Sequence, residues 1–499
     1  MDEPCVIENV CFVGSDKPVD IAVGHGRIAS VRPSERPTDA ASKIWVIPGL
    51  WDCHTHFTQW SYTLGRLDLI DARSAGEALD MLHRHLEERR ENGALDPNQY
   101  VVGMRFRHSL WSDDAQPTLA AIDAVAGDQP VALSSADMHC GWVNSAAARK
   151  LGVDVDESGL VGELEWFDAY CKLDKGPGAA NELMHLLRNA ERDAASKGVV
   201  GVRDYEMAEN IDTWISRFSQ GLDGLRVEAG IYPERLRQAI DDGWHTGDEL
   251  PGSHGLGHVG AMKMISDGSL NTRSAYCSMP YSGIRPETYG TLSYAPEQIE
   301  SYMRLAVEHG FDIACHAIGD EANTIVLDCV ERTHAHGSIE HAQMLKERDI
   351  PRLAQLGLAV SIQPQHAMDD RDVIARFWGT PAGIPYAFNS LHKVGTKLLM
   401  GSDAPVAPLD PWMAISAAVF GTESSDREPF QPEQCLDFET ALASSTAVGR
   451  VALRDADAAD LVLLDCDPSI IDSPEAMRAM PEHVLGTMLA GRWTYQQAE

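Results

Sequence analysis

The sequence predicts an α/β fold: a (β/α)8 barrel of the TIM type, with a β-sandwich built from both termini and an α/β insertion after the first barrel strand. Three observations support this prediction. The chain has 499 residues, which suits a large barrel with accessory parts better than one small domain. Eight short apolar segments, each followed by helix-like sequence, run along the chain, and β-type runs occupy both of its ends.

The eight apolar segments are the predicted barrel strands. Their continuous apolar character is typical of strands that are buried on both faces, as in a parallel sheet. Each segment ends in polar or charged residues, and helix-like sequence follows it. The predicted strands cover residues 43–54, 198–205, 225–231, 259–267, 312–316, 337–341, 358–363 and 397–403.

Two further parts of the chain surround the barrel. About 145 residues separate the first predicted strand from the second, far more than an ordinary βα connection, so this stretch predicts an inserted subdomain. Strand-like runs at 100–106 and 130–134 agree with that interpretation. At the two ends, short β-type runs are expected to pair with each other, because isolated hairpins are only marginally stable. The expected domains are a composite β-sandwich (1–47 with 440–499), the barrel (48–58 with 196–439) and the insertion (59–195).

Composition limits the classes of partner and the compartment. The formal charge of −34, from 41 basic and 75 acidic residues, disfavours nucleic acids and anionic membranes as partners. The N-terminus lacks the pattern of a signal peptide, and no apolar stretch reaches the ~18 residues of a membrane span. The ten cysteines are scattered without a Cys-x-x-Cys pair, which is typical of free thiols in a reducing compartment. We therefore expect a soluble, cytoplasmic protein.

The ends of the predicted strands carry the chemistry. The first strand ends in His54-Thr55-His56, whose two imidazoles point to one face because side chains alternate along a strand. In a barrel of this kind the active site lies at the carboxyl ends of the strands. Taken singly, each of these residues has a structural alternative: a hydrogen-bonded core histidine, or a turn or helix cap for the aspartate. Together they predict a metal site at one mouth of the barrel, built from His54, His56, Lys263, His316, His341 and Asp403.

The ordered set of motifs resembles the amidohydrolase superfamily. Within it, the chain is similar to the amidohydrolase-3 group of metal-dependent hydrolases, which includes N-substituted formamide deformylase-like proteins. The resemblance covers nearly the whole chain. It rests on PGLWDCHTH at 48–56, SADMH at 135–139, WVNS at 142–145, MKMISDGSL at 262–270, CHAIGD at 315–320, IEHA at 339–342, GSD at 401–403 and AADLV at 458–462.

The resemblance implies a role for each strand-end residue. The four histidines would be ligands of Zn²⁺ or another divalent metal, bound as one or two ions, and Asp403 would be both a ligand and the general base. An unmodified ammonium opposes metal binding, so Lys263 is expected to be a carbamate that bridges two metals. The alternative is a cationic Lys263, salt-bridged to Asp267 or another acid, that supports the site from outside.

Several other residues are weaker candidates for contact with substrate. His139, Trp142 and Asn144 in the insertion are expected to help cover the mouth of the barrel. After the predicted strands, Asp267 and Arg273 would orient the substrate and Gln363 would donate a hydrogen bond to it. For the loop residues a purely structural role is an equal alternative. His366, just beyond Gln363, receives no role.

The expected function is metal-dependent hydrolysis of a C–N bond in a non-peptide amide, of the N-acyl or N-formyl amine type. Two alternatives remain open at this point. The first is hydrolysis of another acyl bond, in a carbamate, a lactone or a cyclic amide. The second is a non-catalytic, metal-binding regulatory protein, against which the retention of Asp403 with all four histidines argues. The expected partner is a small-molecule substrate, and a homodimer is one expected assembly because such barrels often pair.

Overall fold

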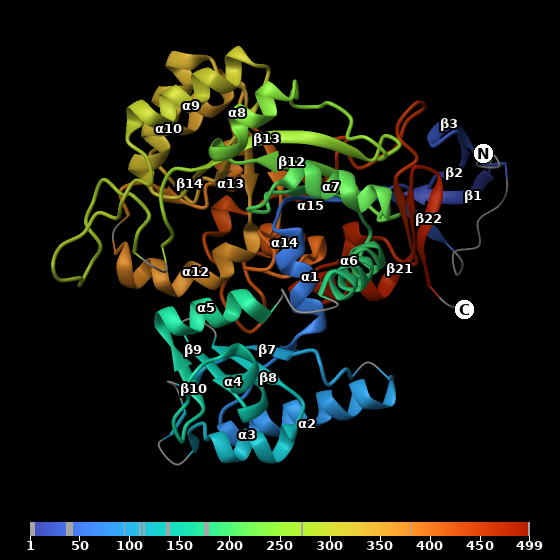
Figure 1. The fold of residues 1–499 in the computed structure, drawn as a ribbon. Coiled ribbons are helices and arrows are strands. Elements are labelled where there is room, and N and C mark those ends of the chain that lie inside the picture. The colour runs from blue at the N-terminus through green and yellow to red at the C-terminus, as the bar shows by residue number, and fades with distance from the viewer. Residues whose placement is uncertain are drawn as a thin grey trace. The chain divides into compact units, whose positions relative to one another are not determined.

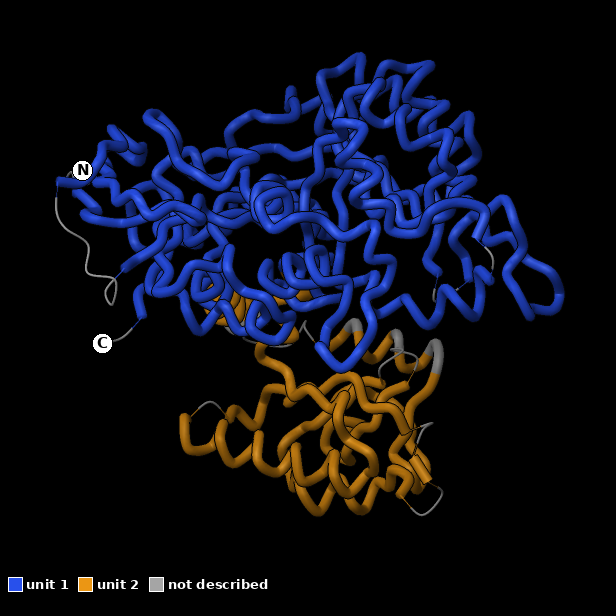
Figure 2. Tube along the Cα trace, turned by 180° about the vertical axis from the view of Figure 1, so that it is seen from behind, with its two compact units in different colours: residues 1–57, 191–499 blue, residues 58–190 orange. Residues whose placement is uncertain are grey.

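Two units make up the protein in the computed structural model, and the larger one is built around a parallel barrel (Figure 1). The structure describes residues 5–35, 43–93, 95–108, 111–112, 115–135, 140–173, 179–270, 273–379 and 381–497. Unit 1 comprises residues 1–57 and 191–499, and unit 2 comprises residues 58–190 (Figure 2).

The barrel of unit 1 has eight strands, and every hydrogen-bonded neighbour pair in it is parallel. Sequence order and spatial order agree around the sheet, which confirms the predicted (β/α)8 arrangement. The strands are β5 (Leu50–Thr55), β11 (Val199–Asp204), β12 (Arg226–Ile231), β13 (Gly257–Ile265), β14 (Ile313–Ala317), β15 (Gly337–His341), β17 (Ala359–Ile362) and β19 (Lys397–Met400).

The seam between the first and last barrel strands lies directly beside the predicted site. Thr55 forms a parallel bridge with Ala404. The main-chain amide of Asp403 donates to the carbonyl of His54 at 2.7 Å, and that of His56 donates to the carbonyl of Ala404 at 2.8 Å. Gly401 permits this approach, because a Cβ atom there would lie 2.7 Å from the main-chain nitrogen of His54. The closure of the barrel therefore brings residues 54 and 403 together.

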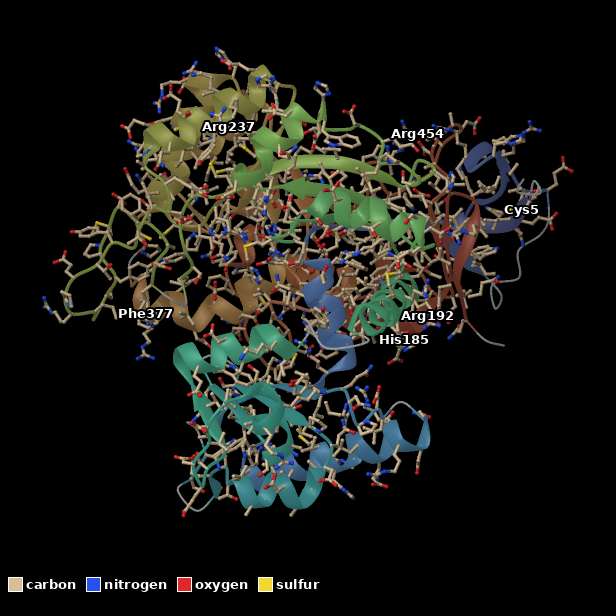
Figure 3. The ribbon with its side chains drawn as sticks, in the orientation of Figure 1. Cys5, His185, Arg192, Arg237, Phe377 and Arg454 are labelled. Atoms are coloured by element: carbon tan, nitrogen blue, oxygen red, sulfur yellow. The ribbon has the colours of Figure 1, made fainter. Side chains whose placement is uncertain are left out.

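Helices follow the barrel strands and cover them with their apolar faces. In α8, for example, Leu236 and Ala239 are buried while Arg237 is exposed on the outer face (Figure 3). Asp410 caps α14 by accepting a hydrogen bond from the amide of Trp412 at 2.9 Å. These helices are α7 (Asn210–Ser219), α8 (Pro233–Asp241), α9 (Pro296–Glu308), α10 (Asp320–Thr333), α11 (Ile350–Gln355), α12 (Pro364–Phe377), α13 (Phe388–Lys393), α14 (Pro411–Phe420) and α15 (Phe438–Ser444).

The two chain ends meet in one seven-stranded sheet, in the order β22-β21-β20-β4-β1-β2-β3. The link between the ends is the antiparallel pair β20·β4. The predicted first strand, 43–54, is interrupted at Gly49: β4 joins the terminal sheet and β5 joins the barrel. The strands of the terminal sheet are β1 (Cys5–Phe12), β2 (Pro18–Gly24), β3 (Arg27–Pro33), β4 (Ile44–Pro48), β20 (Leu461–Leu464), β21 (Val484–Leu489) and β22 (Arg492–Gln496).

Unit 2 has its own five-stranded sheet, in the order β10-β9-β8-β7-β6, and its own core. The large side chains Phe106, Trp111 and Trp142 are buried in that core. The strands are β6 (Leu67–Asp68), β7 (Val101–Phe106), β8 (Val131–Ser135), β9 (Cys140–Val143) and β10 (Leu160–Gly162). The helices of this part of the chain are α1 (Phe57–Gly65), α2 (Ala75–Glu91), α3 (Leu119–Ala126), α4 (Ser145–Leu151), α5 (Glu163–Leu173) and α6 (Ala179–Ser196).

Short elements complete unit 1: β16 (Met344–Leu345), β18 (Ile384–Pro385), α16 (Pro474–Arg478) and the 3-10 turns η4 (Pro432–Gln434), η5 (Pro468–Ile470) and η6 (Met480–His483). Strands β16 and β18 pair with each other just beyond the end of β15. Within the described ranges, no helix has both the length and the apolar character that crossing a membrane requires.

Candidate metal centre

Three buried side chains at the mouth of the barrel bring their ligand atoms together. One nitrogen each of His54 and His341 and one carboxylate oxygen of Asp403 all lie within 4.8 Å of one another. The three residues come from the ends of β5 and β15 and from the turn after β19. The structure thus brings together three of the residues that the sequence assigns to the metal.

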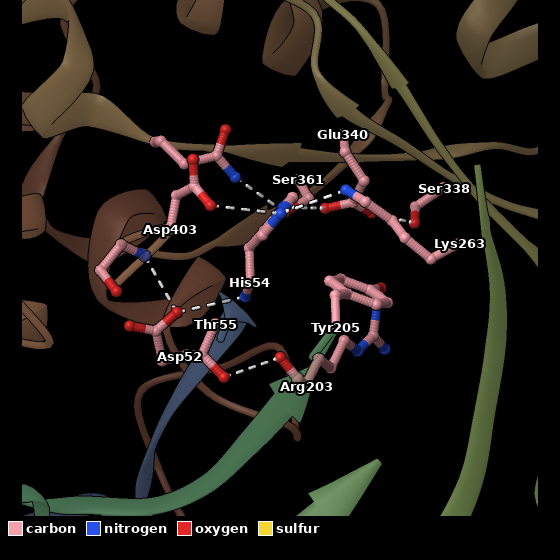
Figure 4. Close-up of polar contacts among 12 residues, drawn as sticks. Asp52, His54, Thr55, Arg203, Tyr205, Lys263, Ser338, Glu340, Ser361 and Asp403 are labelled. Atoms are coloured by element: carbon pink, nitrogen blue, oxygen red, sulfur yellow. Dashed lines mark hydrogen bonds and ion pairs between the residues drawn. The ribbon is translucent and has the colours of Figure 1, made fainter. Parts of the chain in front are cut away.

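Glu340 sets the orientation of His54. Its Oε2 accepts a hydrogen bond from His54 Nδ1 at 2.7 Å, and its Oε1 accepts one from the Ser338 hydroxyl at 2.5 Å (Figure 4). Burial alone would raise the pKa of Glu340, but the hydrogen bond from His54 holds this pKa at about 2. Because Nδ1 carries the shared proton, Nε2 of His54 keeps its lone pair for a ligand.

The backbone of His54 is fixed by Asp52. One carboxylate oxygen of Asp52 accepts hydrogen bonds from the main-chain amides of His54 at 3.1 Å and Ser402 at 2.9 Å (Figure 4). Asp52 therefore ties the end of β5 to the turn after β19. Burial raises the pKa of this carboxyl to about 7.

Asp403 lies among three imidazoles. Its Oδ1 is 3.5 Å from His54 Nε2 and 3.4 Å from His56 Nε2, and its Oδ2 is 3.2 Å from His366 Nε2. The residue adopts a φ of 59°, an uncommon backbone state for a non-glycine residue. Burial alone would raise its pKa, but His54, His366 and His56 together hold it well below the ordinary value. Asp403 is therefore an anionic oxygen donor.

His316 and His341 form the opposite side of the centre. Their ring centroids are 4.5 Å apart, and that of His341 is 4.8 Å from the ring of His54. Burial, together with the neighbouring imidazoles of His316 and His54, lowers the pKa of His341 well below its ordinary value. The ring of His341 is thus neutral, which is the state that binds metals.

Lys263 reaches the same centre from the interior of β13. Its Nζ is 3.1 Å from His54 Nε2 and 4.8 Å from the centroid of the Tyr205 ring. The side chain is 2% exposed, and burial lowers the pKa of its amine. Among the described residues, no carboxylate lies within ion-pairing distance of Nζ.

The donor set fits a divalent transition metal. Neutral imidazoles and a carboxylate are ligands that zinc and its neighbours prefer. The Nδ1 atoms of His56 and His341 are buried and have no hydrogen-bond partner among the described residues. A bound ion would satisfy polar atoms that the chain itself leaves unpaired.

A cavity of about 620 Å³ opens onto this centre, a size suited to a small molecule. Six of its lining residues are the predicted metal-site residues. The other described lining residues are apolar (Met207, Ile265, Leu270, Ile318 and Val406) or carry a polar or charged group (Tyr232, Ser269, Gln343, His366, Asp369 and Asp370).

Among the weaker candidates in unit 1, Asp267 organises the backbone. Its carboxylate accepts hydrogen bonds from the amides of Tyr276, Ile318 and Gly319 at 2.9–3.0 Å, and it lies 3.4 Å from His316 Nε2. The Arg273 guanidinium lies 5.3 Å from the Phe377 ring centroid. Gln363 is 2% exposed and donates to the Ser361 hydroxyl at 3.1 Å.

The candidates in the insertion are held by the packing of unit 2. Trp142 is fully buried and packs 6.5 Å from Phe106, centroid to centroid. Asn144 caps α4 by accepting from the amide of Ala147 at 2.9 Å, and it also accepts from the amide of Val131 at 3.0 Å. His139 lies outside the described residues.

Three residues of the centre were given no role from the sequence: Asp52, Glu340 and His366. A signal existed for the first two, because a carboxylate inside an apolar, fully buried strand must be paired. For His366 no local signal existed. It stands in α12, and only the fold shows that it contacts Asp403.

Comparison with known proteins agrees with this geometry. The model of the amidohydrolase family matches residues 40–495. The chain is 26% identical to the putative amidohydrolase YtcJ of Bacillus subtilis, over 91% of this chain and 89% of that protein. It is 25% identical to the N-substituted formamide deformylase of Arthrobacter pascens, over 90% of each chain.

Among solved structures, the fold resembles an uncharacterized metal-dependent hydrolase from Pyrococcus horikoshii. The TM-score is 0.75 and the identity 22%, over 94% of this chain and 99% of that one. The match of the family model over most of the chain, and a barrel whose mouth gathers histidines and an aspartate, lead to one conclusion: the chain belongs to the amidohydrolase family of metal-dependent hydrolases.

Proposed function

We propose that the protein hydrolyses the C–N bond of a non-peptide amide, of the N-acyl or N-formyl amine type. One observation carries this proposal: the ligand atoms of the buried residues His54, His341 and Asp403 lie close together, and the three residues line a cavity of about 620 Å³. The similarity to a protein named N-substituted formamide deformylase supports the choice of bond.

The reaction needs an activated water and a route for its proton. A divalent ion held by His54, His341 and Asp403, which we propose to be Zn²⁺, would supply a water that ionises near neutral pH, and the ion would also polarise the substrate carbonyl. Asp403 accepts the proton of the attacking water and delivers it to the nitrogen. The C–O bond forms, the C–N bond breaks, and an acid and an amine leave.

His56 and His366 hold the proton carrier in place. Each contributes an Nε2 atom within 3.4 Å of an Asp403 oxygen, one on each side of the carboxylate. The carboxylate is therefore restrained in both its position and its rotation. This arrangement suits a group that must collect a proton on one side of a bond and release it on the other.

We also propose that Lys263 is carbamylated and contributes an anionic ligand. Carbamylation requires an uncharged amine, and burial favours that form of Lys263. A cationic Lys263 would need Asp267 or another acid as its salt-bridge partner. The carboxylate of Asp267 instead accepts three main-chain hydrogen bonds. The short distance of 3.1 Å from Nζ to His54 Nε2 supports a place for the carbamate beside the histidine ligands.

The test combines metal content with turnover. Protein loaded with Zn²⁺ or Mn²⁺ is assayed on formamides, N-acyl amines, carbamates, lactones and esters. We expect amide hydrolysis, and we expect Asp403→Asn to lower kcat by about 100-fold or more while the fold is kept. The matched control is Asp372→Asn, an exposed carboxylate on α12 that pairs with Arg427. Stoichiometric metal binding without turnover of any compound would instead favour a regulatory protein.

A further inference from the structure

Gln343 is a buried amide side chain in the wall of the cavity. Its side chain is 3% exposed, and its Oε1 has no hydrogen-bond partner within the described part of the chain. Its main chain is anchored, because the carbonyl accepts from the amide of Tyr386 at 2.7 Å. A buried, unpaired acceptor is costly in a folded protein, so a ligand that donates a hydrogen bond explains it best.

The backbone before Gln343 is bent in an unusual way. His341 and Ala342 adopt φ values of 72° and 45°, both in the left-handed region. This bend follows β15 directly and leads into β16. The same turn therefore positions the His341 ligand and the Gln343 amide, two residues apart in the same cavity wall.

The charge of the cavity outside the metal ligands is negative. Asp369 and Asp370, both on α12, line it, and Lys263 is the one Lys or Arg among its described lining residues. Asp370 is buried and accepts from the Tyr386 hydroxyl at 2.7 Å, whereas Asp369 is exposed. A carboxylate on the substrate would meet like charges here and no guanidinium.

The adjoining cavity has one cation among its described lining residues, and that cation already has an acidic partner. It measures about 380 Å³ and shares Met207, Tyr232 and Ile265 with the main cavity. Its Arg235 is paired with Glu209 at 2.6 Å. Its other charged lining residue, Glu234, accepts from the Tyr294 hydroxyl at 3.2 Å. Both cavities therefore combine apolar side chains with acidic ones: Asp369 and Asp370 in the first, and Glu234 in the second.

We propose that Gln343 Oε1 accepts the N–H of the scissile secondary amide, and that the cavity selects N-acyl amines that are neutral or cationic over those that carry a carboxylate. This inference rests on the proposed function and narrows its substrate class. Asp369 supplies the charge selection, the apolar wall holds the hydrocarbon part of the amine, and Gln343 recognises the nitrogen.

The charge selection is tested with three matched compounds: N-benzylformamide, N-formylphenylglycine and its uncharged amide, N-formylphenylglycinamide. We expect kcat/KM for N-formylphenylglycine to be about 30-fold or more below that for the amide. Asp369→Asn should reduce this ratio several-fold, and Asp372→Asn on the same helix should leave it unchanged. Equal rates for the acid and the amide would overturn the charge selection.

The role of Gln343 is tested with substrates that have or lack an N–H. Gln343→Leu should lower kcat/KM for N-benzylformamide by about 10- to 30-fold. It should change the rates for benzyl formate and for N-benzyl-N-methylformamide by less than about threefold, because neither can donate to Oε1. An equal loss on all three compounds would show that Gln343 only supports the fold and would overturn its assignment.

A binding measurement separates this inference from the proposed function. Calorimetry with metal-free protein should show benzylammonium binding more tightly than phenylacetate, with the preference reduced in Asp369→Asn. If no amide is turned over but this preference is seen, the proposed reaction fails and the charge selection stands. If amides are turned over but phenylacetate binds as tightly as benzylammonium, the charge selection fails and the reaction stands.

Discussion

The hydrogen bond between Glu340 and His54 provides a quantitative test of the metal centre. Both side chains are buried, at 0% and 1% exposure, and the bond is 2.7 Å long. It holds the proton on Nδ1, so that Nε2 is the proposed ligand atom. Glu340→Gln removes the charge but keeps an acceptor oxygen of similar shape, whereas Glu340→Ala removes the acceptor altogether.

The expected magnitude follows from the type of bond. A hydrogen bond to a charged group contributes about 1.5–3 kcal/mol. At about 1.4 kcal/mol per factor of ten, this corresponds to about 10- to 100-fold in metal affinity. The same range is typical when the partner of a metal-binding histidine is removed. We expect Glu340→Gln near the lower limit and Glu340→Ala near the upper one.

The assay is metal occupancy against a graded series of chelators, measured by elemental analysis, with turnover of N-benzylformamide in parallel. The matched control is Asp248→Asn, because Asp248 accepts a hydrogen bond of 3.2 Å from His245 Nδ1 at the surface, on residues that do not line the cavity. If the Glu340→Ala protein folds correctly and binds metal as tightly as the wild type, the reasoning is refuted. Glu340 would then not be what makes His54 Nε2 a ligand atom.

Three further predictions follow from the fold and the site. Lys263→Ala should lower the bound metal per chain and the activity, as measured by elemental analysis; unchanged stoichiometry and activity would exclude a bridging carbamate. Gly401→Ala should destabilise the protein by about 1–3 kcal/mol in denaturant unfolding, because the new Cβ would lie 2.7 Å from the His54 main-chain nitrogen. The control is Gly24→Ala, where a Cβ would meet nothing within 4 Å, and it should change the free energy of unfolding little. Equal destabilisation by the two substitutions would contradict the close approach at the seam. Trp142→Ala should cost about 3–5 kcal/mol, and Trp142→Phe should keep KM unchanged, because Trp142 is a core residue of unit 2; a raised KM with normal stability in Trp142→Phe would point to substrate contact.

Local sequence patterns were sufficient for the order of the barrel strands and for the placement of the proposed ligands at one mouth of the barrel. Apolar runs such as 312–316 and 337–341 mark strands buried on both faces, and their last residues must lie at one end of a parallel barrel. His54, His341 and Asp403 could thus be placed at one mouth before any contact was known. The predicted single strand 43–54 is two strands, β4 and β5, because the residues on either side of Gly49 pair with different sheets: β4 with β20 and β5 with β11.

The tertiary structure alone decided how the site is supported. The pairing of Glu340 with His54 joins residues 286 positions apart, and that of His366 with Asp403 joins residues 37 positions apart. Gln343 Oε1 has no partner among the described residues, which depends on every segment packed around it. Side-chain period and strand ends are local properties that a sequence displays directly. Hydrogen-bond partners and burial depend on segments that lie far apart in the sequence, so only the folded chain defines them.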